Sequence, residues 1–210
     1  MKLYGYYRSS AAYRVRIALA LKGLHADQAF RHLRKGEQRS ADYLPLNPQG
    51  LVPALVLDDG TALTQSLAII EYLDETYPPP RLLPEDAVQR ARVRAFAQAI
   101  ACEIHAVQNL KVLGRLRALG HGEEVVSGWA HDVIAEGLSA CEALLAGEAG
   151  PFCFGSAPTL ADLALVPQLY NARRFKVDLA AMPRLLAAEA ACMALPAFAD
   201  NVPERQPDAE

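Results

Sequence analysis

The sequence predicts a protein of two parts, an α/β domain followed by an all-α domain. Three observations lead to this prediction. Residues 1–80 alternate between strand-like and helix-like segments, a proline-rich stretch follows at 78–84, and long helical patterns without alternating strands occupy the remainder. We therefore expect one domain at 1–80 and a second at 88–210, joined by a linker at 81–87.

The first segments predict a strand, a helix and a second strand. Leu3–Tyr7 has the composition of a strand, and a helical pattern at 11–22 ends at Gly23, a residue type common just after a helix. Ala29–Leu33 is expected to form the next strand. A tight turn from the first strand into the helix would leave unpaired amides at the helix start.

The next segments complete a βαβαββα order. Ala41–Leu46 is expected to form a short helix, which Asn47-Pro48-Gln49-Gly50 ends with a turn. Residues 53–57 and 61–64 flank Asp58-Asp59-Gly60 and predict a β-hairpin. Ser66 is expected to cap the helix that runs through Leu73.

The second part is expected to be helical throughout. Helical patterns cover 87–119 and 123–146, with glycines between them. Thr159 and Asp162 have the spacing of a capping box at the start of a further helix. The proline-rich end at 203–210 is expected to be weakly ordered unless it packs against the protein.

Composition excludes several classes of function. The chain has 210 residues, is 52% hydrophobic and 21% charged, and carries a net charge of -3 with a pI near 6.0. It therefore has neither the basic surface of a nucleic-acid-binding protein nor an apolar run long enough for a membrane span, and we expect a cytoplasmic protein. The four cysteines form no metal-ligand pattern with the five histidines and are expected to be buried free thiols, so no metal is predicted.

The start of the first helix has the character of an anion site. Ser9 and Ser10 lie there, where free amides and the helix dipole favour negative charge. Arg14 and Arg16 follow within the first turns, where they would either face an anion or point to solvent. No cysteine lies at this position, so a thiolate bound here would have to come from another molecule.

Several segments, in the same order along the chain, resemble the glutathione transferase superfamily. Residues 8–19 resemble the zeta-class Ser-Ser-Cys motif and the helix after it, with Ala11 in place of the cysteine. Residues 47–53 resemble the loop with a cis proline, and 65–73 resemble the helix start that binds glutathione. The resemblance implies a thioredoxin-like N-terminal domain followed by a helical bundle, the glutathione transferase fold.

Three further segments narrow the resemblance to the maleylacetoacetate isomerases. They are Gln108–Leu113, Asn171–Leu179 and Arg205–Asp208. The resemblance implies glutathione as cofactor, with Ser9 donating a hydrogen bond to its sulfur and Ser10 in support. The residues that it implies for binding the rest of glutathione are Gln49, Val52, Pro53, Gln65, Ser66 and Asn109.

The implied reaction is the cis–trans isomerisation of maleylacetoacetate to fumarylacetoacetate, a step of aromatic amino-acid catabolism. A small dicarboxylic acid needs cations at both ends, and Arg8, Lys111 and Arg174 are the candidates. Three alternatives stay open: a maleylpyruvate isomerase, a transferase acting on small halogenated acids, and a non-catalytic binding protein. The family also implies a homodimer.

Overall fold

The computed structural model describes all residues, Met1–Glu210, and divides into two compact units. The first unit contains Met1–Leu83 together with Met193–Glu210, and the second contains Pro84–Cys192. The sequence predicts that the whole of 88–210 belongs to the helical domain, whereas in the structure the chain from Met193 onward belongs to the first unit. The pattern of hydrophobic residues along the chain does not reveal this return, because it depends on tertiary contacts.

The first unit is built on a four-stranded sheet in the order β2-β1-β3-β4. β1 pairs with β2 in parallel and with β3 antiparallel, and β3 pairs antiparallel with β4. Leu3 and Leu55 are neighbours in this register and are both fully buried, so the centre of the sheet is part of the core. The strands are Lys2–Gly5 (β1), Asp27–Phe30 (β2), Ala54–Val56 (β3) and Ala62–Thr64 (β4).

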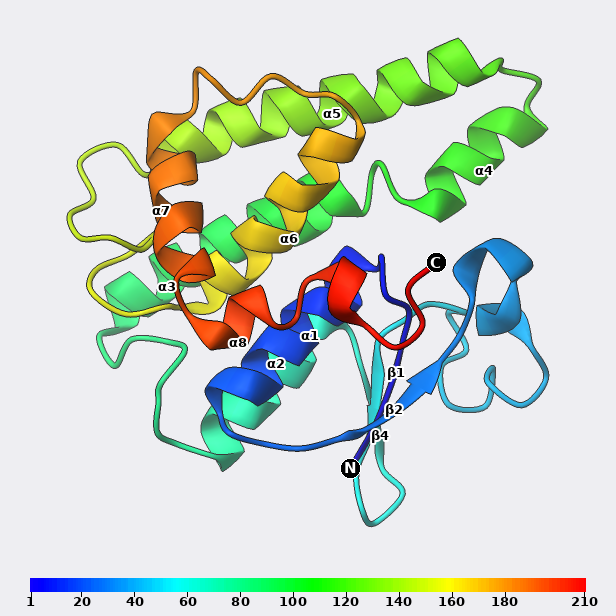
Figure 1. Cartoon of the computed structure of the whole chain (residues 1–210), viewed down its shortest axis with the longest axis horizontal. Coiled ribbons are helices and arrows are strands. Elements are labelled where there is room, and N and C mark those ends of the chain that lie inside the picture. The colour runs from blue at the N-terminus through cyan, green and yellow to red at the C-terminus, as the bar shows by residue number, and fades with distance from the viewer. The chain divides into compact units, whose positions relative to one another are not determined.

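Two helices, α1 (Ser10–Leu21) and α2 (Ser66–Thr76), pack side by side in the first unit (Figure 1). The predicted end of α1 is confirmed. Gly23 has a positive φ of 63°, and its amide donates to the carbonyl of Ala20 while the Leu24 amide donates to that of Leu19. This pair of bonds satisfies the last carbonyls of the helix.

The prediction of a short helix at 41–46 is wrong. Two short 3-10 helices, η1 (Leu33–Lys35) and η2 (Glu37–Arg39), precede a run of turns at 41–46. Pro45 provides the reason, because it has no amide hydrogen to continue a helical ladder. The α/β order of the first unit is otherwise as predicted.

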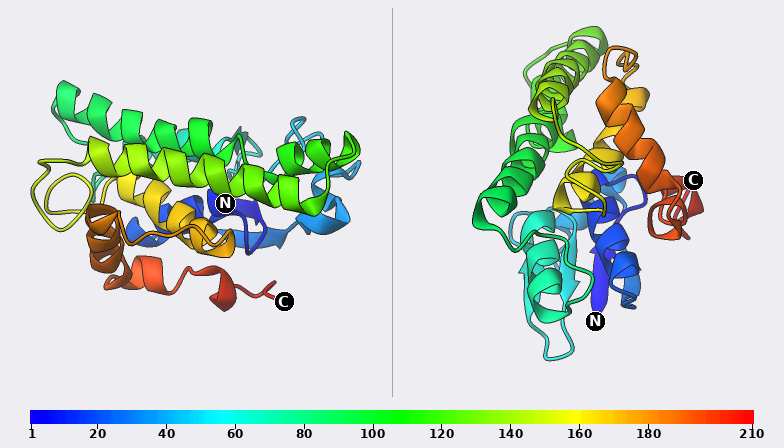
Figure 2. Two further views of the ribbon diagram at one scale, coloured as in Figure 1. Left: turned by 90° about the horizontal axis from the view of Figure 1, so that it is seen from above. Right: turned by 90° about the vertical axis from the view of Figure 1, so that its left-hand side faces the viewer.

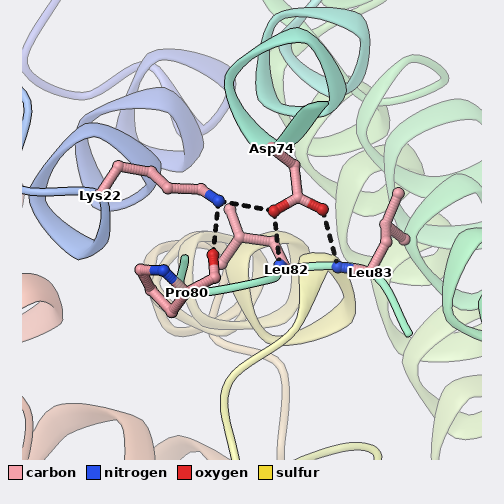
Figure 3. Close-up of polar contacts among 5 residues, drawn as sticks. All are labelled: Lys22, Asp74, Pro80, Leu82 and Leu83. Atoms are coloured by element: carbon pink, nitrogen blue, oxygen red, sulfur yellow. Dashed lines mark hydrogen bonds and ion pairs between the residues drawn. The ribbon is translucent and has the colours of Figure 1, made fainter. Parts of the chain in front are cut away.

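A buried ion pair connects the end of α1 with the chain that leaves α2 (Figure 3). Lys22 Nζ lies 2.6 Å from Asp74 Oδ1, with the lysine side chain fully buried, and it also donates to the Pro80 carbonyl. The same carboxylate accepts the amides of Leu82 and Leu83 at 2.7 and 3.1 Å. Removing one partner of such a pair leaves an uncompensated buried charge, so this network fixes the exit of the first unit.

The second unit is entirely helical (Figure 2). The helical pattern at 87–119 forms more than one helix: a π-helical turn follows the first helix, and Asn109 caps the next one. The predicted capping box is confirmed: Asp162 Oδ2 accepts from the Thr159 amide at 2.8 Å at the start of α6. The elements are α3 (Ala87–Gln98), η3 (Ala99–His105), α4 (Leu110–Ala118), α5 (Glu123–Leu144), α6 (Leu160–Arg174) and α7 (Pro183–Met193).

The end of the chain contains the short helix α8 (Pro196–Ala199) and a 3-10 turn, η4 (Pro203–Arg205). α8 packs against α1, and Phe198 is fully buried. The proline-rich end is therefore packed down, which is the condition under which the sequence predicts order. None of the helices combines the length and apolar character needed to cross a bilayer.

Candidate active site

The start of α1 presents two buried hydroxyl groups. Ser9 is the N-cap, and its Oγ accepts a hydrogen bond from the Ala12 amide at 3.2 Å. Ser9 and Ser10 are only 8% and 6% exposed. Because the cap uses a lone pair of Ser9 Oγ, its hydroxyl hydrogen is available to donate to a ligand. Ser9 can therefore serve as helix cap and as ligand donor together.

The backbone at this helix start favours an anion. Ser10 and Ala11 occupy the first two helical positions, where an amide has no acceptor within the helix. The first turn carries no acidic side chain that would compete with an anionic ligand. The amides, the helix dipole and the Ser9 hydroxyl thus combine into one anion-binding position.

The chain supplies no reactive thiol of its own at this position. Burial raises the pKa of Cys141 to about 12 and, together with Asp162, raises the pKa values of Cys153 and Cys192. These three cysteines are buried as expected, but Cys102 is exposed, which corrects the prediction for that residue. Thiols with raised pKa values remain protonated near neutral pH and are poor nucleophiles.

A second cluster of polar groups lies at the start of α2. Ser66 is the first helical residue and not the cap that the sequence predicted; Gln65 occupies the cap position with a positive φ of 67°. Such a backbone conformation is rare for residues other than glycine and is frequent at ligand sites. The Gln65 side-chain amide donates to Gln49 Oε1 at 2.8 Å, which joins the α2 start to the preceding loop.

The loop at 47–53 is fixed by hydrogen bonds to a single carbonyl. Leu51 O accepts from the Tyr43 hydroxyl at 2.6 Å and from Asn47 Nδ2 at 2.8 Å. The Val52–Pro53 peptide is cis, as the resemblance implies. Pro53 directly precedes Ala54, whose partner in the sheet is Thr64, so the end of the loop lies next to Gln65.

Arg14 joins the two helix starts. The sequence left open whether this side chain faces an anion or solvent, and the structure excludes solvent because Arg14 is only 1% exposed. Its Nη1 lies 3.3 Å from Ser66 Oγ and donates to it. An arginine within an otherwise apolar helical pattern was the available signal, but its partner could not be identified from spacing.

Arg8 lies in the turn between β1 and α1, beside Ser9. It is half-buried, and its guanidinium carbon lies 4.8 Å from the centre of the Tyr7 ring. This contact is a cation–π interaction. Arg8 thus lies next to Ser9 and Ser10, its neighbours in the sequence, in the first unit.

The other three candidate residues belong to the second unit. Asn109 caps α4, since its Oδ1 accepts from the amides of Lys111 and Val112 at 3.0 and 3.2 Å. Lys111 is exposed in the first turn of α4. Arg174 is the exposed last residue of α6, and its Nη1 donates to Asn171 Oδ1 at 3.4 Å.

Comparison with known families assigns the class of protein. A family model described as "Glutathione S-transferase, N-terminal domain" matches residues 3–81, and one described as "Glutathione S-transferase, C-terminal domain" matches residues 85–191. The chain belongs to the glutathione S-transferase family. The fold class and the family resemblance predicted from the sequence are both confirmed.

Individual relatives narrow the comparison. The chain is 51% identical to a maleylacetoacetate isomerase of Pseudomonas aeruginosa, over 99% of this chain and 98% of that protein. A solved structure of a maleylpyruvate isomerase, described as a bacterial glutathione S-transferase of the zeta class, is 46% identical, covers 100% of both chains and superimposes with a TM-score of 0.96. A maleylacetoacetate isomerase from Methylobacterium extorquens, solved with bound malonate and glutathione, is 42% identical over 100% of both chains, also with a TM-score of 0.96.

Proposed function

We propose that this chain is a glutathione-dependent isomerase that converts maleylacetoacetate to fumarylacetoacetate. The observation that carries the proposal is the pair of helix starts joined by Arg14, which offers two anion-binding positions within one unit and no cysteine at either. Glutathione has a thiol and, at its glutamyl end, a carboxylate. The donor set therefore fits this cofactor.

Ser9 acts on the thiol end in this proposal, with Ser10 in support. A free thiol with a pKa of about 8.5 is only about 3% ionised at pH 7. Lowering that pKa by roughly two units corresponds to about 2.7 kcal/mol in favour of the thiolate. A charge-assisted hydrogen bond from the Ser9 hydroxyl and the dipole of α1 together are of this size.

Ser66 and Gln65 bind the glutamyl end. The Ser66 amide and hydroxyl lie at the start of α2, where a carboxylate is favoured, and the buried Arg14 adds a positive charge beside them. Gln49 and the backbone of Val52, next to Pro53, bind the middle of the cofactor. Asn109 is the remaining residue that the family resemblance implies for glutathione binding.

Glutathione held by these residues would supply a thiolate nucleophile for reversible addition to the conjugated double bond of the substrate, which is the chemistry that a cis–trans isomerisation needs. The substrate has a carboxylate at each end. Arg8, Lys111 and Arg174 bind these carboxylates, and arginine does so with two parallel hydrogen bonds. The bound malonate of the Methylobacterium extorquens structure supports a site for small dicarboxylates.

Maleylpyruvate isomerisation is the second candidate function. The similarity to a solved maleylpyruvate isomerase favours it, since that chain is 46% identical with a TM-score of 0.96. The Gln108-Asn109-Leu110 segment and the Pseudomonas aeruginosa relative favour maleylacetoacetate instead. Both reactions need the same thiolate, so they differ only in substrate recognition.

We also propose that the protein is a cytoplasmic homodimer, as the family resemblance implies. Sedimentation at low protein concentration tests the assembly. A single species with the mass of one chain would contradict it.

The experiment that tests the function is an absorbance assay with purified protein and maleylacetoacetate, coupled to fumarylacetoacetate hydrolase. We expect turnover that requires glutathione and leaves its concentration unchanged. A parallel assay with maleylpyruvate compares kcat/KM for the two substrates. Absence of turnover with both, together with measurable glutathione binding, would contradict the isomerase proposal and favour conjugation or binding alone.

A further inference from the structure

The turn that carries Arg8 and Ser9 contains one residue, Tyr7, whose backbone amide and carbonyl both have hydrogen-bond partners outside the turn. This turn, Tyr6–Ser9, lies between the end of β1 and the start of α1 and is closed by a hydrogen bond from the Ser9 amide to Tyr6 O at 2.9 Å. Tyr7 lies inside the turn, and neither its amide nor its carbonyl takes part in the sheet. Both groups bond to other parts of the first unit.

The Tyr7 amide is bound by the end of the chain. It donates to Asp208 Oδ2 at 2.9 Å, across 201 positions of sequence. The Tyr7 carbonyl accepts from Arg16 Nη2 at 3.2 Å, and the same nitrogen lies 3.2 Å from the carbonyl of Asn201. Arg16 therefore connects the turn with the residues that follow α8.

The opposite charges of Arg16 and Asp208 support the same contacts. Arg16 is 5% exposed, and burial lowers its pKa to about 10 while the Asp208 carboxylate acts in the opposite direction. Asp208 Oδ1 is buried without a hydrogen-bond partner. A buried carboxylate oxygen of this kind is tolerated when an opposite charge is near, and Arg16 supplies that charge.

Other contacts attach the same segment along its length. The Tyr13 hydroxyl donates to the carbonyl of the fully buried Phe198 at 3.3 Å. His32 Nε2 lies 2.6 Å from Glu210 Oε1, beside the Tyr6 ring. The segment 193–210 is thus bound to α1, to the Tyr6–Ser9 turn and to the residue that precedes η1, His32.

We propose that residues 193–210 form a strap that positions the Tyr6–Ser9 turn, with Asp208 and Arg16 as positioning residues for the Ser9 hydroxyl and the Arg8 guanidinium. Tyr7 lies two positions before Ser9 and one before Arg8, so movement of the Tyr7 backbone moves both side chains. Catalytic groups lose much of their effect when displaced by about 1 Å. The catalytic consequence rests on the proposed function, whereas the structural role of the strap does not.

The test compares Asp208→Ala with Asp208→Asn, and Asp200→Ala serves as the matched control. Asp200 is an aspartate of the same segment that pairs with the exposed Arg205 and has no contact with the turn among the hydrogen bonds described. Asn at 208 keeps an acceptor for the Tyr7 amide but has no charge. Each variant is assayed for isomerisation, for the pKa of bound glutathione by thiolate absorbance, and for amide hydrogen exchange at Tyr7–Ser9.

We expect Asp208→Ala to accelerate exchange of the Tyr7 amide by about tenfold, to lower kcat/KM by about five- to tenfold and to raise the pKa of the bound thiol. Asp208→Asn should lie between this variant and the unmodified protein, and Asp200→Ala should match the unmodified protein. Unchanged exchange and unchanged thiol pKa in both Asp208 variants would overturn the proposal. Because the exchange measurement needs no substrate, a failure of the isomerase function would be seen separately, as inactivity of the unmodified protein.

Discussion

The two groups of candidate residues differ in how firmly the structure fixes them. At the start of α1, Ser9 and Ser10 are buried, Ser9 is held by its cap bond, and the amide and the carbonyl of the nearby Tyr7 are both hydrogen-bonded. In the second unit, Lys111 and Arg174 are exposed long side chains at helix ends. A fixed donor suits a charge that develops at one atom, whereas long, exposed side chains can reach carboxylates at different positions.

Two relatives that differ in their named substrates agree with this difference between the two groups of residues. The solved maleylpyruvate isomerase and the Pseudomonas aeruginosa maleylacetoacetate isomerase are 46% and 51% identical to this chain, yet they act on different substrates by name. A shared thiol site with a separately adjustable acid site would allow this. Variants in the two regions should therefore change different kinetic constants.

The largest effect is expected for Ser9→Ala. Loss of the hydroxyl donor should lower kcat by about a hundredfold, because one donor to a developing anion contributes roughly 3 kcal/mol. KM for glutathione should change little. Steady-state kinetics with varied glutathione measure both constants.

Ser9→Thr is the matched control, since threonine keeps a hydroxyl and also caps helices. It should retain most of the activity. Stability needs separate measurement, because the lost cap in Ser9→Ala should lower the free energy of unfolding by about 1 kcal/mol. If Ser9→Ala kept full kcat, Ser10 or the backbone amides would have to activate the thiol.

Arg174→Ala should have the next largest effect, and it should change binding of the acid substrate, not activation of the thiol. Loss of a charged partner for a substrate carboxylate should raise KM for the acid by about tenfold or more. The affinity for glutathione should remain unchanged. Arg173→Ala is the matched control, since Arg173 is the preceding residue and pairs with Glu189. Equal effects of the two substitutions would refute a specific role for Arg174.

Ser66→Ala should weaken glutathione binding by about fivefold with little change in kcat. The variant loses the acceptor of the Arg14 hydrogen bond and, in the proposed site, one donor to the glutamyl carboxylate. Isothermal titration measures the change in Kd. Ser127→Ala, on the exposed surface of α5, should leave Kd unchanged. A large loss of kcat in Ser66→Ala would show that the two helix starts are not functionally separate.

Tyr43→Phe tests the ionisation of a tyrosine whose hydroxyl supports the loop at 47–53. Its effect on the free energy of unfolding at neutral pH should be small. Burial raises the pKa of Tyr43 to about 12, so the folded protein keeps this proton between pH 10 and 12 while the unfolded chain loses it. The free energy of unfolding should therefore fall as pH rises through that range, by up to about 3 kcal/mol from this residue. Urea unfolding at pH 8 and pH 11 measures the fall, which should be smaller in Tyr43→Phe. An identical fall in both proteins would show that Tyr43 ionises normally.

Local patterns predicted the parts of the fold and site that depend on neighbouring residues. The end of α1 at Gly23, the hairpin of β3 and β4, and the Thr159–Asp162 capping box follow from short-range chemistry and are confirmed. The position of Ser9 at the start of α1 also follows from the local sequence. The cis peptide before Pro53 was found only through the family resemblance.

Features that depend on long-range contacts could not be predicted. Arg14 and Arg16 are buried because partners from α2 and from the end of the chain surround them, and spacing carries no information on such partners. The return of residues 193–210 to the first unit is missed for the same reason. The wrong prediction of a helix at 41–46 has a local cause instead, because Pro45 has no amide hydrogen for a helical hydrogen bond.

In the proposed site, the start of α1 converts the thiol of bound glutathione into a thiolate without help from a protein cysteine. The most direct test is a pH titration of thiolate absorbance for glutathione bound to the purified protein. We predict a pKa near 6.5, roughly two units below that of a free thiol. A bound thiol that titrates with the pKa of free glutathione would show that the start of α1 does not activate the cofactor.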